Sequence, residues 1–308
     1  MRTRWMLAWL EERFPLRNGL FFVLLYVTTV LVARMSVSAT AVSLTVRDLV
    51  GVGALWSFFL VLRVFDEHKD YAADAIAHPD RVLQRGLVTL AQLRVLAGCA
   101  IAFQLTVSLW FDGGVGTITA WWAGAMLWSI IMAREFFAKV WLRRHLVIYA
   151  LSHMAVMLVL VAWVASIGAS TAWRQPIVWM FAGLVFLAGL VFEIARKIRA
   201  PDDERPMADS YTRALGTRLA PALLAVLAAI TSLVAVALAR RIAAPLSAVV
   251  PGVVGAFTTL AVFAAARFAV HPTRRRAKLA EAVAGLSIMA AHTMIVAAVV
   301  SVRTIVWR

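Results

Sequence analysis

Cysteine, acidic side chains and extended polar stretches are all scarce in this chain of 308 residues. The single cysteine, Cys99, excludes an internal disulfide bond and any zinc site built on cysteine ligands. Asp and Glu number 16 against 31 Lys and Arg, so the formal net charge is +15. No low-complexity tract or long linker interrupts the chain, and we therefore expect a single domain over residues 1–308.

Apolar residues dominate the composition. They make up 63% of the chain and the mean hydropathy is +0.85, whereas a soluble domain is about half apolar. The apolar runs repeatedly approach the roughly 20 residues with which a helix crosses a bilayer. We therefore expect an all-α integral membrane protein with about nine transmembrane helices. The predicted spans are residues 19–34, 43–65, 90–110, 117–138, 146–168, 175–195, 219–239, 246–269 and 280–302.

The segment before the first span mixes apolar and charged residues. This character is typical of a short interfacial helix, which we expect within residues 1–17. Charges at Glu11, Glu12 and Arg13 prevent a continuous apolar core there, so we expect no cleavable signal peptide.

The basic residues are divided unequally between the two sides of the predicted bundle. The N-terminus and the connections after spans 2, 4, 6 and 8, with the adjoining span ends, hold 24 of the 31 Lys and Arg. The positive-inside rule then places the N-terminus and these connections in the cytoplasm, and the C-terminus on the opposite side. Topology and attraction to the lipid bilayer account for the basic charge, so we expect no nucleic-acid partner.

Four carboxylates follow the second span. At about 100° per residue on a helix, they fall within one arc of about 100°. Like charges this close raise one another's pKa or require a cation, and at a membrane surface such a cluster indicates a functional site. Pro79 is expected to end this helix. The four residues are Asp66, Glu67, Asp70 and Asp74.

Arg81 and Arg85 bring cations back toward these carboxylates. One interpretation is that they form salt bridges at the helix end. The functional interpretation is a Mg²⁺ site in which carboxylates hold the metal and arginines hold the phosphates that it bridges, since Mg²⁺ favours a few carboxylates plus phosphate oxygens.

The two longest predicted loops, 66–90 and 196–218, lie on the same side and both combine acidic with basic residues. We expect them to converge over one cavity as active-site loops. A prenyl diphosphate is the natural ligand, because its apolar tail suits the helices and its anionic head needs Mg²⁺ and cations. Glu193 and Lys197 are four residues apart, so an ion pair along the helix explains this part of the second loop equally well.

The first loop resembles the first motif of the UbiA superfamily of intramembrane prenyltransferases, N-D-x-x-D-x-x-x-D followed by R-P-[LI]-x-x-G. Asp66 stands at the Asn position, Glu67 at the first Asp, and Asp70 and Asp74 at the other two. The run 81–86 matches the downstream element with Val82 in place of proline. The resemblance implies nine transmembrane helices, with Asp-rich motifs on cytoplasmic loops after helices 2 and 6.

The second motif departs from the family pattern of D-x-x-x-D before G-x-x-T. Glu193 takes the first Asp position, Lys197 stands four residues later, and the run 209–212 resembles the closing element with Asp for Gly. The resemblance also implies a diphosphate-contacting Lys after span 4, for which Lys139 is the candidate. It implies a metal set of Asp66, Glu67, Asp70, Asp74, Glu193 and Asp203, with Asp70 and Asp74 as catalytic residues. The diphosphate set is Arg81, Arg85, Lys139 and Lys197.

Two histidines fall inside predicted spans. His153 suits a base at the acceptor site or a packing role equally, whereas packing is favoured for His292.

The function expected is Mg²⁺-dependent transfer of a prenyl group from its diphosphate to a small or lipidic acceptor, aromatic by analogy with the family. One alternative is a membrane terpene cyclase of the same superfamily, which ionises a prenyl diphosphate without an acceptor. Another is a divalent-cation transporter. The position of the charges at the span ends argues against it, because transport sites usually lie near the bilayer midplane.

Overall fold

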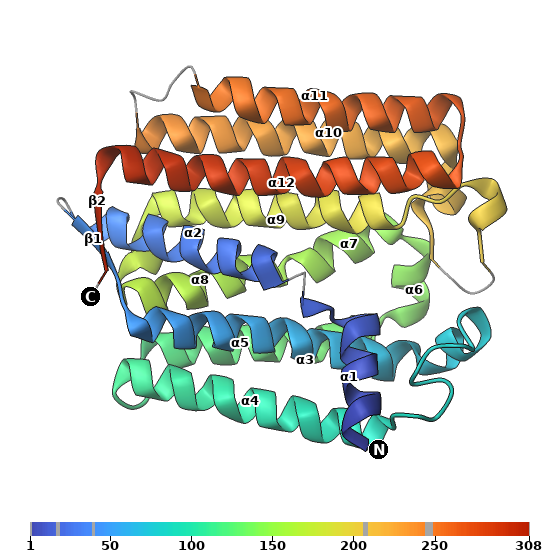
Figure 1. Ribbon diagram of the computed structural model, residues 1–308, viewed down its shortest axis with the longest axis horizontal. Helices are drawn as coiled ribbons and strands as arrows, with labels where there is room; N and C mark the ends of the chain where they lie inside the picture. Colours follow the sequence, from blue (N-terminus) through green and yellow to red (C-terminus); the bar gives the residue numbers. More distant parts are fainter. Residues whose placement is uncertain (1, 17–18, 39–40, 206–208, 244–248, 308) are drawn as a thin grey trace.

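The computed structural model describes residues 2–16, 19–38, 41–205, 209–243 and 249–307 (Figure 1). Residues 1 and 17 of the predicted interfacial segment lie outside the described residues. So do residues 206–208 of the second loop and 246–248 of the eighth span.

The described chain is an all-α membrane bundle, which confirms the predicted fold class. Each predicted span corresponds to a helix or, for the fifth, to two consecutive helices. Eight of these segments are long and apolar enough to cross a bilayer, and α5 is shorter at 17 residues. The helices are α2 (Gly19–Val37), α3 (Val46–Ala77), α4 (Leu90–Asp112), α5 (Thr117–Ala133), α7 (Leu146–Met154), α8 (Val156–Gly168), α9 (Pro176–Arg196), α10 (Tyr211–Ile242), α11 (Val249–Val270) and α12 (Arg274–Val302).

The helices run side by side along the long axis of the molecule (Figure 1). Helices α3, α4 and α5 form one flank and α10, α11 and α12 the other, while α2, α8 and α9 pack between them. The centre is therefore the most apolar part, and Leu160, Trp163 and Phe181 are fully buried there. Buried charged side chains, such as Asp48 and Glu193, lie toward the helix ends instead.

One end of the bundle is closed by a parallel strand pair that the sequence did not indicate. Strand β1 (Ala41–Leu44) pairs with β2 (Thr304–Trp307), with Ala41 opposite Thr304. Beside it, Arg34 pairs with Asp48 through both carboxylate oxygens at 2.9 and 2.8 Å. These contacts join the start of α3 to the end of α12 and leave the opposite end for the polar loops.

The polar end carries the short helices α1 (Arg2–Arg13), η2 (Glu135–Phe137), α6 (Lys139–Arg144) and η4 (Pro201–Asp203). Helix η3 (Ala172–Arg174) lies at the other end. Helix α1 runs across the direction of the bundle helices (Figure 1), and its interfacial location stays a prediction.

Two helix boundaries at the polar end differ from the predicted spans. Helix α3 continues past the predicted end of the span at residue 65 to Ala77, so the four carboxylates lie on its last turns, as their helical arc and the expected stop at Pro79 indicated. Helix α5 stops at Ala133 and not at 138, because residues 135–137 adopt positive φ angles. Because α3 remains helical to Ala77, its carboxylates stay on one face. Because α5 ends at Ala133, the chain that follows it turns toward these carboxylates.

Candidate active site

A polar cavity of about 210 Å³ lies at this end, between the ends of α3 and α9. Side chains from residues 66–90 and from residues 196–218 line it. The numbers of basic and acidic side chains that line the cavity are similar. Seven cations line it, namely Arg13, Arg63, Lys69, Arg81, Arg196, Lys197 and Arg199. Five carboxylates do so as well, namely Asp66, Asp70, Asp74, Glu135 and Asp209.

The four carboxylates of α3 separate into three that line the cavity and one that does not. Asp66, Asp70 and Asp74 recur every fourth residue and reach it together. The side chain of Glu67 is fully buried, and its Oε1 accepts hydrogen bonds from Arg13 Nε at 2.6 Å and Arg63 Nε at 3.0 Å. Glu67 therefore joins α1 to α3, and its predicted role as a metal ligand stays a prediction.

Two guanidinium groups converge on Asp74. Arg81 Nη1 lies 2.6 Å from Asp74 Oδ2, and Arg13 Nη2 lies 3.6 Å from the same oxygen. With Glu67 and Arg63 included, three guanidinium groups share two carboxylates. The remaining positive charge faces the cavity and favours an anionic ligand there.

On the α9 side, the cations are held by a buried carboxylate. Glu193 Oε1 lies 2.7 Å from Lys197 Nζ, and its Oε2 accepts a hydrogen bond of 2.7 Å from Arg196 Nε. The ion pair that the spacing of Glu193 and Lys197 allowed is thus formed. Arg196 and Lys197 line the cavity, and Glu193 orients them from behind.

Tyr149 of α7 stands between two lysines of the cavity. Its hydroxyl oxygen accepts a hydrogen bond of 3.0 Å from Lys69 Nζ, and Lys197 Nζ lies 4.9 Å from the centre of its ring. Lys69 Nζ also lies 3.2 Å from Asp66 Oδ1. These contacts fix the positions of both ammonium groups. Tyr149 was not predicted as a site residue, because nothing in an apolar span distinguishes a tyrosine that faces a polar cavity.

Besides Glu67 and Glu193, three residues of the predicted site are not among the described residues that line the cavity. Arg85 and Lys139 are exposed, and Asp203 lies 3.6 Å from Arg274 Nε through its Oδ1. Their assigned roles stay predictions. The cavity instead takes Arg199 and Asp209 from the second loop.

The closing element of the second motif organises this loop. The hydroxyl groups of Ser210 and Thr212 donate hydrogen bonds of 2.7 and 3.0 Å to Glu204 Oε1, and Thr212 Oγ1 accepts one of 3.0 Å from the Arg199 backbone N–H. These bonds hold Arg199 beside Asp209 at the cavity wall.

Residues Glu135, Phe136 and Phe137 form an unusual turn after α5. Their φ angles are 49°, 51° and 58°, in the left-handed region that side chains other than glycine rarely adopt. Each such residue costs about 1–3 kcal/mol, and strain of this kind gathers at functional sites. The turn places the buried Glu135 at the cavity.

Neither intramembrane histidine is among the described cavity-lining residues. His153 is buried behind Tyr149, with ring centres 3.7 Å apart, and its Nδ1 lies 2.8 Å from the Tyr149 carbonyl oxygen. His292 packs against the edges of Phe21 and Phe181, which agrees with the favoured packing role.

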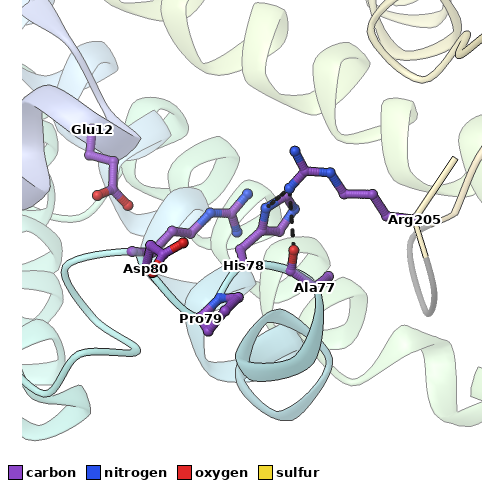
Figure 2. A pocket seen from close by; sticks show the side chains of 7 residues that line it. Glu12, Ala77, His78, Pro79, Asp80 and Arg205 are labelled. Carbon is purple, nitrogen blue, oxygen red and sulfur yellow. Dashed lines mark hydrogen bonds between the residues drawn. The ribbon is translucent and has the colours of Figure 1, made fainter. Parts of the chain in front are cut away.

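A second hollow, of about 310 Å³, adjoins the first and shares His78 and Arg81 with it. Figure 2 shows Arg205 reaching from the second loop to the end of α3. Arg205 Nη1 donates to His78 Nδ1 at 2.7 Å and to the Ala77 carbonyl oxygen at 3.2 Å. Because a guanidinium can only donate, His78 Nδ1 must be unprotonated. These two hydrogen bonds of Arg205 join the second loop to the first, and we call this contact the latch.

The latch is expected to open in acid. Partial burial and the nearby guanidinium groups of Arg81 and Arg205 lower the pKa of His78 below its usual value of about 6.5. The opened state therefore binds the proton first, and the stabilisation is complete above pH ~6.5 and declines as the pH falls below it. Hydrogen–deuterium exchange of residues 199–205, corrected for the intrinsic rate, should be several-fold faster at pH 5.5 than at pH 7.5. His78→Asn keeps an acceptor that does not titrate and should remove the difference; an unchanged difference would contradict the latch.

The donor set of the cavity suits Mg²⁺ that arrives with an anionic ligand. Within the described part of the chain, no group of three or more His, Cys, Asp or Glu side chains is placed to hold a metal ion by itself. Mg²⁺ is usually held by one or two carboxylates, water and substrate phosphates and not by a complete protein cage. Asp66, Asp70 and Asp74 are the residues that would hold it.

Comparison with known proteins supports the fold. No protein-family model matches the chain, and no curated protein sequence matches it significantly. A solved structure of a digeranylgeranylglyceryl phosphate synthase, an intramembrane prenyltransferase of the UbiA superfamily, is similar with a TM-score of 0.59. The alignment covers 97% of this chain and 99% of that chain at 11% sequence identity. The resemblance to the UbiA superfamily that the sequence motifs indicated is thus confirmed at the level of the fold.

Proposed function

We propose that this protein is a Mg²⁺-dependent intramembrane prenyltransferase. The observation that carries the proposal is the cavity at the end of the apolar bundle, where three carboxylates of α3 face cations from α1, α9 and both loops. A diphosphate head group with bound Mg²⁺ needs both kinds of side chain, and a prenyl tail needs the apolar helices beside them. The shared fold with a prenyltransferase supports the same function.

The cations of the cavity would bind the diphosphate. Arg81 and Lys197, both expected from the sequence, line it together with Arg13, Arg196 and Arg199. Arginine suits bidentate contacts with phosphate, and lysine acts as a point charge. Bound Mg²⁺ would stabilise negative charge on the departing diphosphate.

The reaction begins when the bond between prenyl C1 and the diphosphate oxygen breaks and its electron pair leaves with the diphosphate. Preorganised cations favour this step because charge develops on the leaving group. The resulting allylic cation is captured by an acceptor, aromatic by analogy with the family. Following the positive-inside rule, we place the cavity on the cytoplasmic side and the C-terminus on the opposite side.

The test uses purified protein in liposomes, radiolabelled geranylgeranyl diphosphate and an extract of the native cells as the source of acceptor. Labelled product should form with Mg²⁺ and disappear with EDTA. A labelled cyclic hydrocarbon formed without the extract would show a terpene cyclase instead. Intact diphosphate under all conditions would contradict both functions.

A further inference from the structure

Glu135 is a buried carboxylate with an unused oxygen at the cavity. It lines the cavity, is 2% exposed, and its Oε2 has no hydrogen-bond partner among the described residues. Burial of an unsatisfied carboxylate oxygen is unfavourable, so each such group requires an explanation. By contrast, Asp66 and Asp74 are each paired with cations of the cavity. An incoming ligand that donates a hydrogen bond would satisfy Glu135.

The backbone gives independent evidence that the position of Glu135 matters. A regular continuation of α5 would avoid three consecutive positive φ angles. The turn is held by Phe136, whose ring meets the edges of Trp128 at 5.6 Å and His153 at 5.7 Å between centres. Aromatic packing thus maintains the strained turn that places Glu135 at the cavity.

We propose that Glu135 is the acceptor-side carboxylate, which accepts first a hydrogen bond and then the proton of a hydroxyl group on the acceptor. This inference rests on the proposed prenyl transfer. The prenyl C1–O bond breaks and its electron pair leaves with diphosphate, a lone pair of the acceptor oxygen forms the new bond to C1, and the hydroxyl proton moves to Glu135 Oε2. The step needs no oxidant or reductant.

The assignment restricts the chemistry of the acceptor. A carboxylate at this position attracts hydroxyl donors and repels an anionic group placed next to it. The acceptor is therefore a hydroxyl-bearing molecule whose reacting end carries no carboxylate. The cations that line the cavity remain available for the diphosphate.

Glu135→Gln tests the assignment, because glutamine keeps the shape and an acceptor oxygen but cannot take the proton. In the liposome assay with geranylgeranyl diphosphate, Mg²⁺ and cell extract, we expect kcat for transfer to fall by about 10²-fold or more. The KM for geranylgeranyl diphosphate should stay within about twofold, because Glu135 is assigned to the acceptor and not to the diphosphate. Glu135→Asp should restore part of the activity and its dependence on pH, which a structural role would not predict.

Glu11→Gln is the matched control, because Glu11 is exposed on α1 at the same end of the bundle. It should behave as the wild type. Wild-type transfer by Glu135→Gln would overturn the proposal, as would a tenfold rise in its KM for geranylgeranyl diphosphate, which would place Glu135 with the diphosphate. If the wild type itself leaves the diphosphate intact, the proposed function is contradicted, and with it the role of Glu135 that rests on it.

Discussion

Replacing Asp70 or Asp74 by Asn is expected to reduce prenyl transfer by about 10²–10³-fold, the cost of removing one preorganised electrostatic contact to a developing charge. Both carboxylates line the cavity from successive turns of α3. Asn keeps the size of the side chain and removes the negative charge that attracts Mg²⁺. The measurement is the rate of label transfer from geranylgeranyl diphosphate as a function of Mg²⁺ concentration.

The two variants should differ in how excess Mg²⁺ affects them. Asp74 also pairs with Arg81 and Arg13, so Asp74→Asn disturbs a proposed diphosphate ligand as well as the metal. We expect excess Mg²⁺ to restore more activity to Asp70→Asn than to Asp74→Asn. Asp202→Asn, at an exposed position of the second loop, is the matched control and should remain fully active. Undiminished transfer by both variants would refute the metal assignment.

The helical spans could be predicted because each leaves a long apolar run in the sequence. The carboxylate arc could be predicted as well, since a helical repeat of 3.6 residues places Asp66, Asp70 and Asp74 on one face. The helical spacing could not predict that the side chain of Glu67 does not line the cavity. The position of this side chain depends on its ion pair with Arg13 of α1, which lies 54 residues away in the sequence.

The remaining part of the site depends on contacts that have no local signal. The left-handed turn at 135–137 contains no glycine, the residue that usually adopts positive φ angles. Nothing local in the sequence therefore predicts that the helix ends before these residues. It exists because Phe136 packs against His153 from α7 and Trp128 from α5. The strand pair of β1 and β2 likewise requires two segments at opposite ends of the sequence to meet. Both features depend on tertiary contacts between segments that are distant in the sequence, so the sequence alone did not predict them.

The contacts of Glu67 lead to the second large expected effect, a loss of stability. In Glu67→Ala, Arg13 and Arg63 lose their shared carboxylate, although their side chains are only 13% and 22% exposed. Breaking a buried ion pair by removing one partner typically costs about 3–5 kcal/mol, because the other charge is left uncompensated. The apparent unfolding temperature in detergent should fall by several degrees, whereas Glu11→Ala should leave it unchanged.

The same contacts separate a structural role of Glu67 from the metal-ligand role that the motif implied. If Glu67 joins α1 to α3, Arg13→Gln should destabilise the wild type strongly and the Glu67→Gln variant little, because the contact is already lost there. The dependence of activity on Mg²⁺ should then be the same in Glu67→Gln as in the wild type. A higher Mg²⁺ requirement with unchanged unfolding temperature would instead place Glu67 on the metal. The outcome decides whether the first motif supplies three or four carboxylates to the chemistry, and whether α1 is held in place by a residue of the motif itself.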